Sequence, residues 1–170
     1  MSFPDFSKNP EPKLRPATDE DQPDLIEVYA STRIEEIALV GWNEAHQLVF
    51  FTMQFQAQHH FYRMQYPAAE HSVIELAGKT IGRLIVVRQE SEIRLADIAL
   101  LPEYRNQGIG AHITYQLIAE ATTTNKPLRL QVLKHSPAVR FYQRLGFRET
   151  GSTDTHFQME YRRIENEEYD

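Results

Sequence analysis

The chain has 170 residues, of which 41% are hydrophobic and 25% are charged, a balance typical of an ordinary globular protein. It has no cysteine, which excludes cysteine nucleophiles, thiolate zinc sites, iron–sulfur clusters and disulfides. The 18 basic and 24 acidic residues leave a formal charge of −6, which disfavours broad binding to nucleic acid. No apolar run approaches the roughly 20 residues that span a bilayer, and the first residues lack the apolar core of a signal peptide. We therefore expect a soluble, cytoplasmic protein with no membrane partner.

The two ends of the chain differ in composition from the residues between them. Residues 1–13 contain three prolines among polar neighbours, which predicts a flexible arm. Residues 164–170 are acidic and lack apolar periodicity, which predicts a solvated tail. Residues 14–163 contain no repeat, linker or compositional break, so we expect a single domain there.

The first half of the chain predicts a short strand over residues 14–17 and two helices. Thr18 and Asp21 have the spacing of a capping box, and apolar residues then recur at helical spacing. A second helix is expected to begin at Asn43, an N-cap residue. Two apolar stripes run along that helix, one formed by Leu48, Phe51, Phe55, Tyr62 and Tyr66 and the other by Phe50, Met53, Ala57 and Met64. Such stripes normally pack on a sheet, and the alternative is that part of this wide face walls a substrate pocket.

The second half of the chain alternates between strand and helix signals. The elements expected there, in chain order, are a hairpin of strands 73–77 and 81–88, a strand 92–101, a helix ending near Asn125, a strand 128–132, a helix from Pro137 to Gly146, and strands 147–151 and 155–163. The whole chain therefore reads as strand, two helices, three strands, helix, strand, helix and two strands. That order predicts a mixed α/β fold.

One loop joins a strand directly to a helix and carries the clearest chemical signal. Gly108 and Gly110 have no Cβ, so the backbone can turn tightly there and approach a ligand closely. The helix that follows presents unpaired N–H groups and the positive end of its dipole. This combination favours a phosphate or pyrophosphate site, and the alternative is a turn whose glycines serve geometry alone. A dinucleotide fingerprint and a P-loop are both excluded, because Ile113 and Ala111 stand at positions where those motifs need other residues.

Two blocks of sequence resemble one known family. Arg105-x-x-Gly108-x-Gly110 is similar to the acyl-CoA signature R/Q-x-x-G-x-G/A of the GCN5-related N-acetyltransferase (GNAT) family. Residues 136–147, SPAVRFYQRLGF, resemble its pattern N-x-A-x-x-L-Y-x-x-x-G-F, and the similarity runs from about residue 14 to 163. The resemblance implies a GNAT fold, with a twisted, mostly antiparallel sheet of about seven strands, a parallel and splayed central pair, and about four helices. The parallel strands are those that contain Asp97 and Arg129.

The resemblance also implies which residues bind acetyl-CoA, the expected cosubstrate. The pyrophosphate would contact backbone N–H groups of Arg105, Asn106, Gln107, Gly108, Ile109, Gly110 and Ala111. The pantetheine arm would lie along Ile98, Ala99 and Leu100, much as a peptide adds to a strand edge. Ser136 stands where the family often has asparagine, and its hydroxyl can still make a hydrogen bond.

Two side chains are candidates for the catalytic steps. The family places a tyrosine at the position of Tyr142, and a phenol with a pKa near 10 can protonate a leaving thiolate. The alternative is that Tyr142 is a core aromatic. Asp97 interrupts an apolar strand face and could accept a proton from the amine, although a salt bridge to Arg94, Arg129 or another base explains it equally well. Glu75, on a neighbouring strand, is the alternative base.

These observations together predict an acetyl-CoA-dependent N-acetyltransferase in which a primary amine of a small molecule or peptide attacks the acetyl group directly. The alternatives are a noncatalytic acyl-CoA-binding or regulatory module and a phosphate binder unrelated to CoA. The resemblance is compatible with a homodimer. No metal site is expected, because His59 and His60 are adjacent on a helix and no H-E-x-x-H motif occurs. Trp42, Tyr62 and Tyr66 are candidates for lining the acceptor pocket, although packing also explains each of them.

Overall fold

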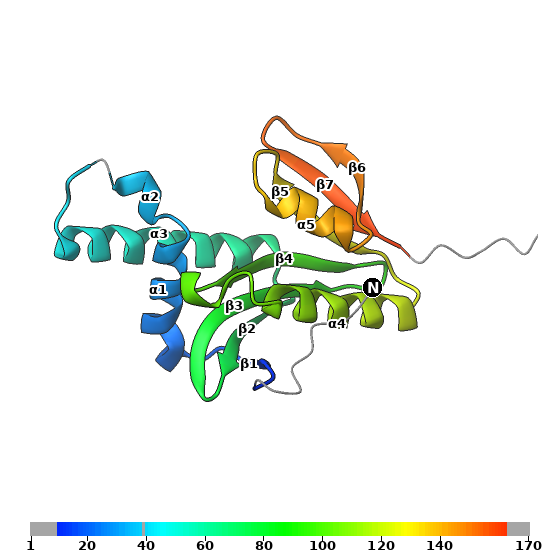
Figure 1. Ribbon diagram of the computed structural model, residues 1–170, viewed down its shortest axis with the longest axis horizontal. Coiled ribbons are helices and arrows are strands. Elements are labelled where there is room, and N and C mark those ends of the chain that lie inside the picture. The colour runs from blue at the N-terminus through cyan, green and yellow to red at the C-terminus, as the bar shows by residue number, and fades with distance from the viewer. Residues whose placement is uncertain (1–9, 39, 163–170) are drawn as a thin grey trace, which may run out of the picture. The chain divides into compact units, whose positions relative to one another are not determined.

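The computed structural model describes residues 10–38 and 40–162, in which the chain forms seven β-strands (Figure 1). By its contacts the chain divides into two compact units. The first contains the described residues up to 87 together with 97–110, and the second contains 88–96 and the described residues from 111 onward. The expected acidic tail and most of the expected N-terminal arm lie outside the described residues, and the single domain stays a prediction.

The strands are β1 (Lys13–Pro16), β2 (Ala69–Leu76), β3 (Lys79–Arg88), β4 (Ile93–Leu100), β5 (Leu128–Leu133), β6 (Arg148–Ser152) and β7 (His156–Tyr161). They form one sheet in the order β1-β2-β3-β4-β5-β7-β6. The β4–β5 pair is parallel, with Ile93 opposite Leu128, whereas the pairs β1–β2, β2–β3, β5–β7 and β6–β7 are antiparallel. The expected mixed, mostly antiparallel sheet with a parallel central pair is therefore confirmed.

The first unit contains helices α1 (Gln22–Ser31), α2 (Ile34–Ile37) and α3 (Glu44–Gln65), with a short 3₁₀ helix, η1 (Asp19–Asp21), before α1. The side chain of Asn43 accepts a hydrogen bond from the His46 amide at 2.9 Å, which confirms Asn43 as the N-cap of α3. The amide and hydroxyl of Thr18 both donate to the Asp21 carboxylate, at 2.7 and 3.0 Å. The single turn of α2 was not expected from the sequence.

The core of the first unit consists of Leu25, Tyr29, Ile37, Phe51, Phe55 and Val73. Tyr29 packs edge-on against both Phe51 and Phe55, with ring centroids 6.5 and 6.1 Å apart. Burial of each large apolar side chain stabilises the fold by about 1.5–3 kcal/mol. This cluster joins α1 and α3, so Phe51 and Phe55 of the first stripe pack into the core as expected, whereas Leu48 of the same stripe is 61% exposed.

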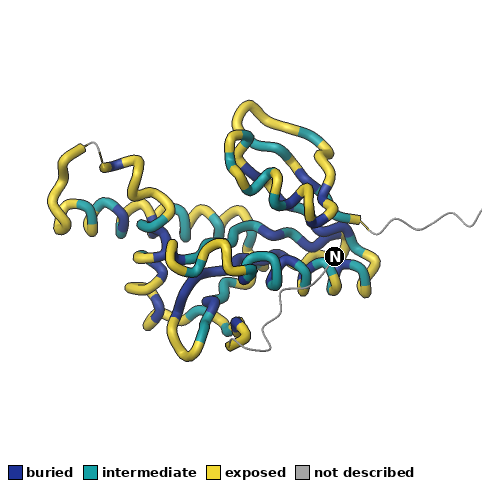
Figure 2. Tube along the Cα trace, viewed as in Figure 1, coloured by how far each residue is buried: buried dark blue, intermediate teal, exposed yellow. Residues whose placement is uncertain are grey.

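The second stripe of α3 does not pack as expected. Met53 and Met64 are 64% and 70% exposed, and long stretches of α3 are exposed in Figure 2. The reason is the helical period, because residues two positions apart point in nearly opposite directions and only one face of α3 meets the core. Met53 is two residues from the buried Phe51 and two from the buried Phe55.

The second unit contains most of α4 (Ile109–Thr123), all of α5 (Ala138–Arg144), and strands β5, β6 and β7. Ile113 and Leu117 of α4 are buried, as are Leu128 and Met159 of the strands. α5 is followed by Gly146, whose φ of 94° confirms the expected end of the helix.

None of the helices in the described part of the chain is long and apolar enough to cross a membrane.

Candidate functional site

The loop between β4 and α4 is tied down by its own side chains. Arg105 Nε donates to the Leu100 carbonyl at 2.8 Å, and its Nη2 donates to the carbonyl and hydroxyl of Ser31 at 3.3 and 3.2 Å. Gln107 Nε2 donates to the Glu103 carbonyl at 2.6 Å. The arginine thus anchors the loop to β4 and to the last residue of α1.

The backbone of this loop has the geometry expected of an anion-binding turn. Asn106 and Gly108 have φ values of 59° and 83°, in the left-handed region that asparagine tolerates and glycine adopts without strain. α4 begins at Ile109, so the dipole of a 15-residue helix starts at this turn. A Cβ added to Gly110 would meet no atom within 4 Å. The space beside Gly110 is therefore open, and the packing of the protein does not require a glycine there.

The end of β4 presents alternate peptide groups to its two edges. The Leu101 amide donates to the Ile81 carbonyl at 2.9 Å, and the Ala99 carbonyl lies against Gly82, where any Cβ would collide with it. Ala99 and Leu101 therefore direct their peptide groups toward β3. Because a strand has a period of two, Ile98 and Leu100 direct theirs toward the opposite edge.

Asp97 forms an ion pair with a residue that we did not expect. Arg83 Nε donates to Asp97 Oδ2 at 2.6 Å, and Arg83 Nη2 donates to Gln58 Oε1 at 2.6 Å. The Arg83 side chain is 9% exposed and that of Asp97 is 22% exposed. The salt bridge that the sequence left open is thus formed, and its partner is on β3.

The other charged residues that we considered are also paired. Arg94 and Arg129 both bind Glu92, at 2.8 and 2.7 Å, instead of Asp97. Glu75 accepts from Arg15 Nε at 2.7 Å. The same guanidinium binds Asp21 and holds the pKa of that carboxyl far below its usual range.

Tyr142 and Ser136 lie in the second unit. Tyr142 is 7% exposed and packs edge-on against Phe141 and Phe147, with ring centroids 5.0 and 5.4 Å apart. Ser136 Oγ accepts from the Ala138 amide at 3.1 Å and so caps the start of α5, which leaves its hydroxyl proton able to donate. Both side chains are therefore held in fixed positions at α5.

The aromatic residues that we considered for an acceptor pocket differ in their surroundings. Trp42 is 39% exposed and packs edge-on against Phe50 at 5.2 Å. Tyr62 and Tyr66 stack with centroids 6.5 Å apart. Burial, together with the charge of Asp97, raises the pKa of Tyr62 to about 12, so this phenol keeps its proton at neutral pH.

Among the described residues, no group of three or more histidine, aspartate or glutamate side chains is arranged to hold a metal ion.

We did not predict from the sequence that Arg83 and Gln58 hold Asp97. A signal for Arg83 was present, because it is the only charged residue between Ile81 and Val87, a run that the structure buries in β3. A charge inside a buried strand needs a partner of opposite sign. The sequence contained no comparable indication for Gln58, because glutamine is common on the exposed faces of helices.

Comparison with known proteins supports a single family. A family model described as an acetyltransferase (GNAT) domain matches residues 41–160. No curated protein sequence matches the chain. Among solved structures, the PaiA N-acetyltransferase of Thermoplasma acidophilum in complex with coenzyme A superposes with a TM-score of 0.67 at 19% identity, over 90% of this chain and 99% of that one.

Two further structures have the same fold. An acetyltransferase from Thermus thermophilus is 20% identical with a TM-score of 0.65, over 90% of this chain and 97% of that one. A GNAT family acetyltransferase from Elizabethkingia anophelis with acetyl-CoA bound is 15% identical with a TM-score of 0.59, over 90% and 99% of the two chains. The family model covers more than half of the sequence, and the strand order matches the fold that the resemblance implied. The chain belongs to the GNAT acetyltransferase family.

Proposed function

We propose that this protein is an acetyl-CoA-dependent N-acetyltransferase that acetylates a primary amine. The observation that carries the proposal is the turn before α4, where Gly108 is left-handed and the space beside Gly110 is open. In a member of this family, such a turn at a helix N-terminus suits the pyrophosphate of CoA. Coenzyme A and acetyl-CoA are bound in the Thermoplasma and Elizabethkingia structures, respectively.

Two segments suit the two parts of this cosubstrate, and Ser136 of the second unit is a further candidate. Residues 105–111 would bind the pyrophosphate through backbone N–H groups, since the side chains of Arg105 and Gln107 already hold the loop. Residues 98–100 would bind the pantetheine amides. Ile98 and Leu100 would supply the peptide groups that form the hydrogen bonds, and Ala99 would separate these two groups along the strand. The hydroxyl of Ser136 would donate to the same arm.

The reaction needs a proton acceptor for the amine and a proton donor for the thiolate. The amine nitrogen attacks the acetyl carbon, the C–N bond forms and the C–S bond breaks, without a covalent enzyme intermediate. Tyr142 gives its phenolic proton to the departing sulfur, and Asp97 takes the proton that the amine loses. Solvent then returns a proton to Tyr142, and Asp97 releases its proton to solvent, which restores both side chains. Arg83 acts as a positioning residue, because it fixes the Asp97 carboxylate at 2.6 Å.

The test is release of free CoA thiol from acetyl-CoA by the purified protein with a panel of amines. The panel should include polyamines, lysine and other amino acids, and peptides with free N-termini. Thiol release that depends on an amine, with the acetylated product seen by mass spectrometry, is the expected result. Binding of acetyl-CoA without thiol release for any amine would instead identify a noncatalytic acyl-CoA-binding module.

A further inference from the structure

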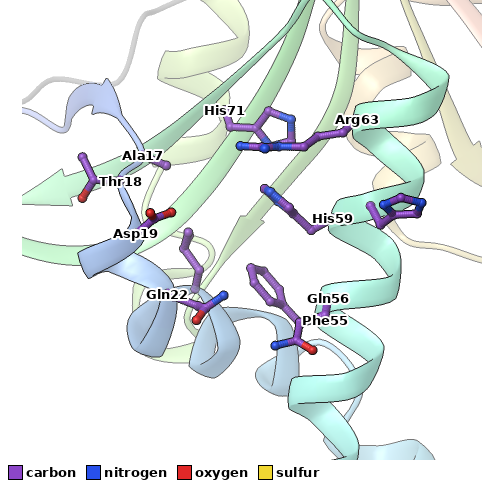
Figure 3. Close-up of a pocket in the computed structure, with 11 residues that line it drawn as sticks. Ala17, Thr18, Asp19, Gln22, Phe55, Gln56, His59, Arg63 and His71 are labelled. Carbon is purple, nitrogen blue, oxygen red and sulfur yellow. The ribbon is translucent and has the colours of Figure 1, made fainter.

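A hollow of about 280 Å³ lies in the first unit, between α1, α3 and β2 (Figure 3). His59 and Arg63 extend into it from α3 toward His71 on β2, and Thr18, Asp19 and Gln22 lie on the opposite side. No residue of the 97–111 segment lines it. The hollow is therefore separate from the residues to which we assign CoA.

Two polar groups in the wall of this hollow have no hydrogen-bond acceptor among the residues that the structure describes. His71 Nε2 is buried and has no hydrogen-bond partner within the described residues. The guanidinium of Arg63 forms no hydrogen bond or ion pair within the described part of the chain. A buried polar group without a partner costs free energy, so the buried His71 Nε2 requires a partner such as a ligand or an ordered water, whereas the exposed guanidinium of Arg63 is hydrated when no ligand is bound.

The charges around the hollow favour an anion of single charge. Among the described residues Arg63 has no ion-pair partner, whereas the charge of Arg83 is balanced by Asp97. His59 and His71 lie with ring centroids 5.0 Å apart. Burial lowers the pKa of His59 below its usual value and that of His71 to about 4, helped by Arg63 and Arg83 and opposed at His59 by Asp19. Both imidazoles are therefore mainly neutral at pH 7, and Asp19, which repels any anion, repels a dianion about twice as strongly as a monoanion.

The remaining wall of the hollow is apolar. Phe55 and Leu25 line it, and both belong to the buried core cluster, so their positions are fixed. A second recess, of about 30 Å³ and large enough for a single water molecule, shares His59 and His71 with the hollow and is also lined by Arg83. The hollow thus combines the cationic Arg63, the polar imidazoles of His59 and His71, and the rigid apolar surface of Phe55 and Leu25.

We propose that this hollow binds a small organic acid, with its carboxylate paired to Arg63 and its apolar body against Phe55 and Leu25. The planar fork of an arginine matches the two oxygens of a carboxylate. The carboxylate, or a water held with it in the recess, accepts a hydrogen bond from His71 Nε2. One ligand thereby supplies the acceptor that both groups lack.

The test uses nuclear magnetic resonance on the isotope-labelled full chain with three carboxylates of different shape, namely hydrocinnamate, benzoate and hexanoate. We expect at least one to cause saturable shifts of the Phe55 amide and of the His59 and His71 imidazole nitrogens. Hydrocinnamamide, which has the same shape without the charge, should bind at least about tenfold more weakly, and phenethylamine should not bind. Because acetyl-CoA is absent, the result does not depend on acetyl transfer.

Two variants make the test specific to the hollow. Arg63→Gln removes the free charge from an exposed position, and we expect it to weaken carboxylate binding about tenfold or more while leaving the thermal unfolding curve unchanged. Arg148→Gln removes an exposed arginine from β6 and should leave binding as in the wild type. The proposal is overturned by equal binding of amide and carboxylate, by wild-type affinity in Arg63→Gln, by shifts that map elsewhere, or by no shift with any of the acids at about 10 mM.

Discussion

Arg83 Nε donates to Asp97 Oδ2 at 2.6 Å, and Arg83 Nη2 donates to Gln58 at the same time. The guanidinium carbon also lies over the rings of Tyr29 and Phe55, 5.7 and 5.9 Å from their centroids. Asp97 is therefore both the balancing charge for a buried arginine and our candidate proton acceptor. These two roles predict different effects of mutation, so they can be separated by experiment.

Asp97→Asn should lower the free energy of unfolding by about 2 kcal/mol, because it leaves the buried Arg83 without its counter-charge. The double variant Arg83→Met/Asp97→Asn should regain most of this loss, since no charge is then left unpaired. Urea unfolding measures both effects, with Asp154→Asn in an exposed turn as the control.

Turnover of the same double variant tests the chemical role. We expect thiol release to stay low in Arg83→Met/Asp97→Asn although the fold is restored, because the proton acceptor is absent. Full turnover would show that Asp97 serves stability alone, and Glu75→Gln would then be the next variant to assay.

Tyr142→Phe should lower kcat by about 10²-fold or more, which is the usual contribution of a general acid, while the Kd for acetyl-CoA changes little. The ring keeps its packing between Phe141 and Phe147, so the fold should be retained. Steady-state thiol release and calorimetric titration separate the two quantities. A variant with wild-type kcat would assign Tyr142 to packing alone.

Gly110→Ala should have opposite effects on stability and on binding. A Cβ there meets open space, and alanine is favoured over glycine in a helix, so the free energy of unfolding should rise by up to about 1 kcal/mol. The same methyl group enters the space that we assign to the pyrophosphate, and acetyl-CoA should bind at least about tenfold more weakly. Unchanged affinity would mean that the open space serves another purpose.

His71 should make stability depend on pH. Its pKa is about 4 in the folded protein and 6.5 as the reference value, so the unfolded chain takes up the proton first as the pH falls. Stability should therefore fall between about pH 7 and pH 4, by about 1–2 kcal/mol after solvent screening of a partly exposed ring.

His71→Phe removes the titrating group and keeps a ring on β2, so it should flatten the part of this slope that His71 contributes. Urea unfolding at pH 7 and pH 5 measures the effect, with the exposed His46→Gln on α3 as the control. An identical slope in wild type and His71→Phe would show that His71 is not the group responsible.

Local signals predicted the fold and the position of the turn before α4. The glycine spacing of residues 108–110, the Asn43 cap and the hairpin of strands 73–77 and 81–88 each depend on the conformations of a few neighbouring residues, so they can be predicted from sequence. The exposure of Met53 could not be predicted, because it depends on which face of α3 meets the core.

Contacts between distant segments could not be predicted from the sequence. Arg83 and Asp97 are 14 residues apart on separate strands, and Gln58 is 25 residues from Arg83. The hollow combines residues from α1, α3 and β2, so no single segment carries a pattern for it. Side-chain chemistry suggested that Asp97 needs a partner, but only the strand register determined which one.

The most direct measurement is thermal unfolding of the purified protein with acetyl-CoA, with CoA and with ADP. A ligand present at 100 times its Kd adds about 2.7 kcal/mol to stability, which shifts the melting temperature by several degrees. We expect a clear rise with acetyl-CoA and CoA, well above that with ADP, and a smaller rise in Gly110→Ala. No shift with any of the three would contradict acetyl-CoA binding and leave residues 105–111 as a turn without a ligand.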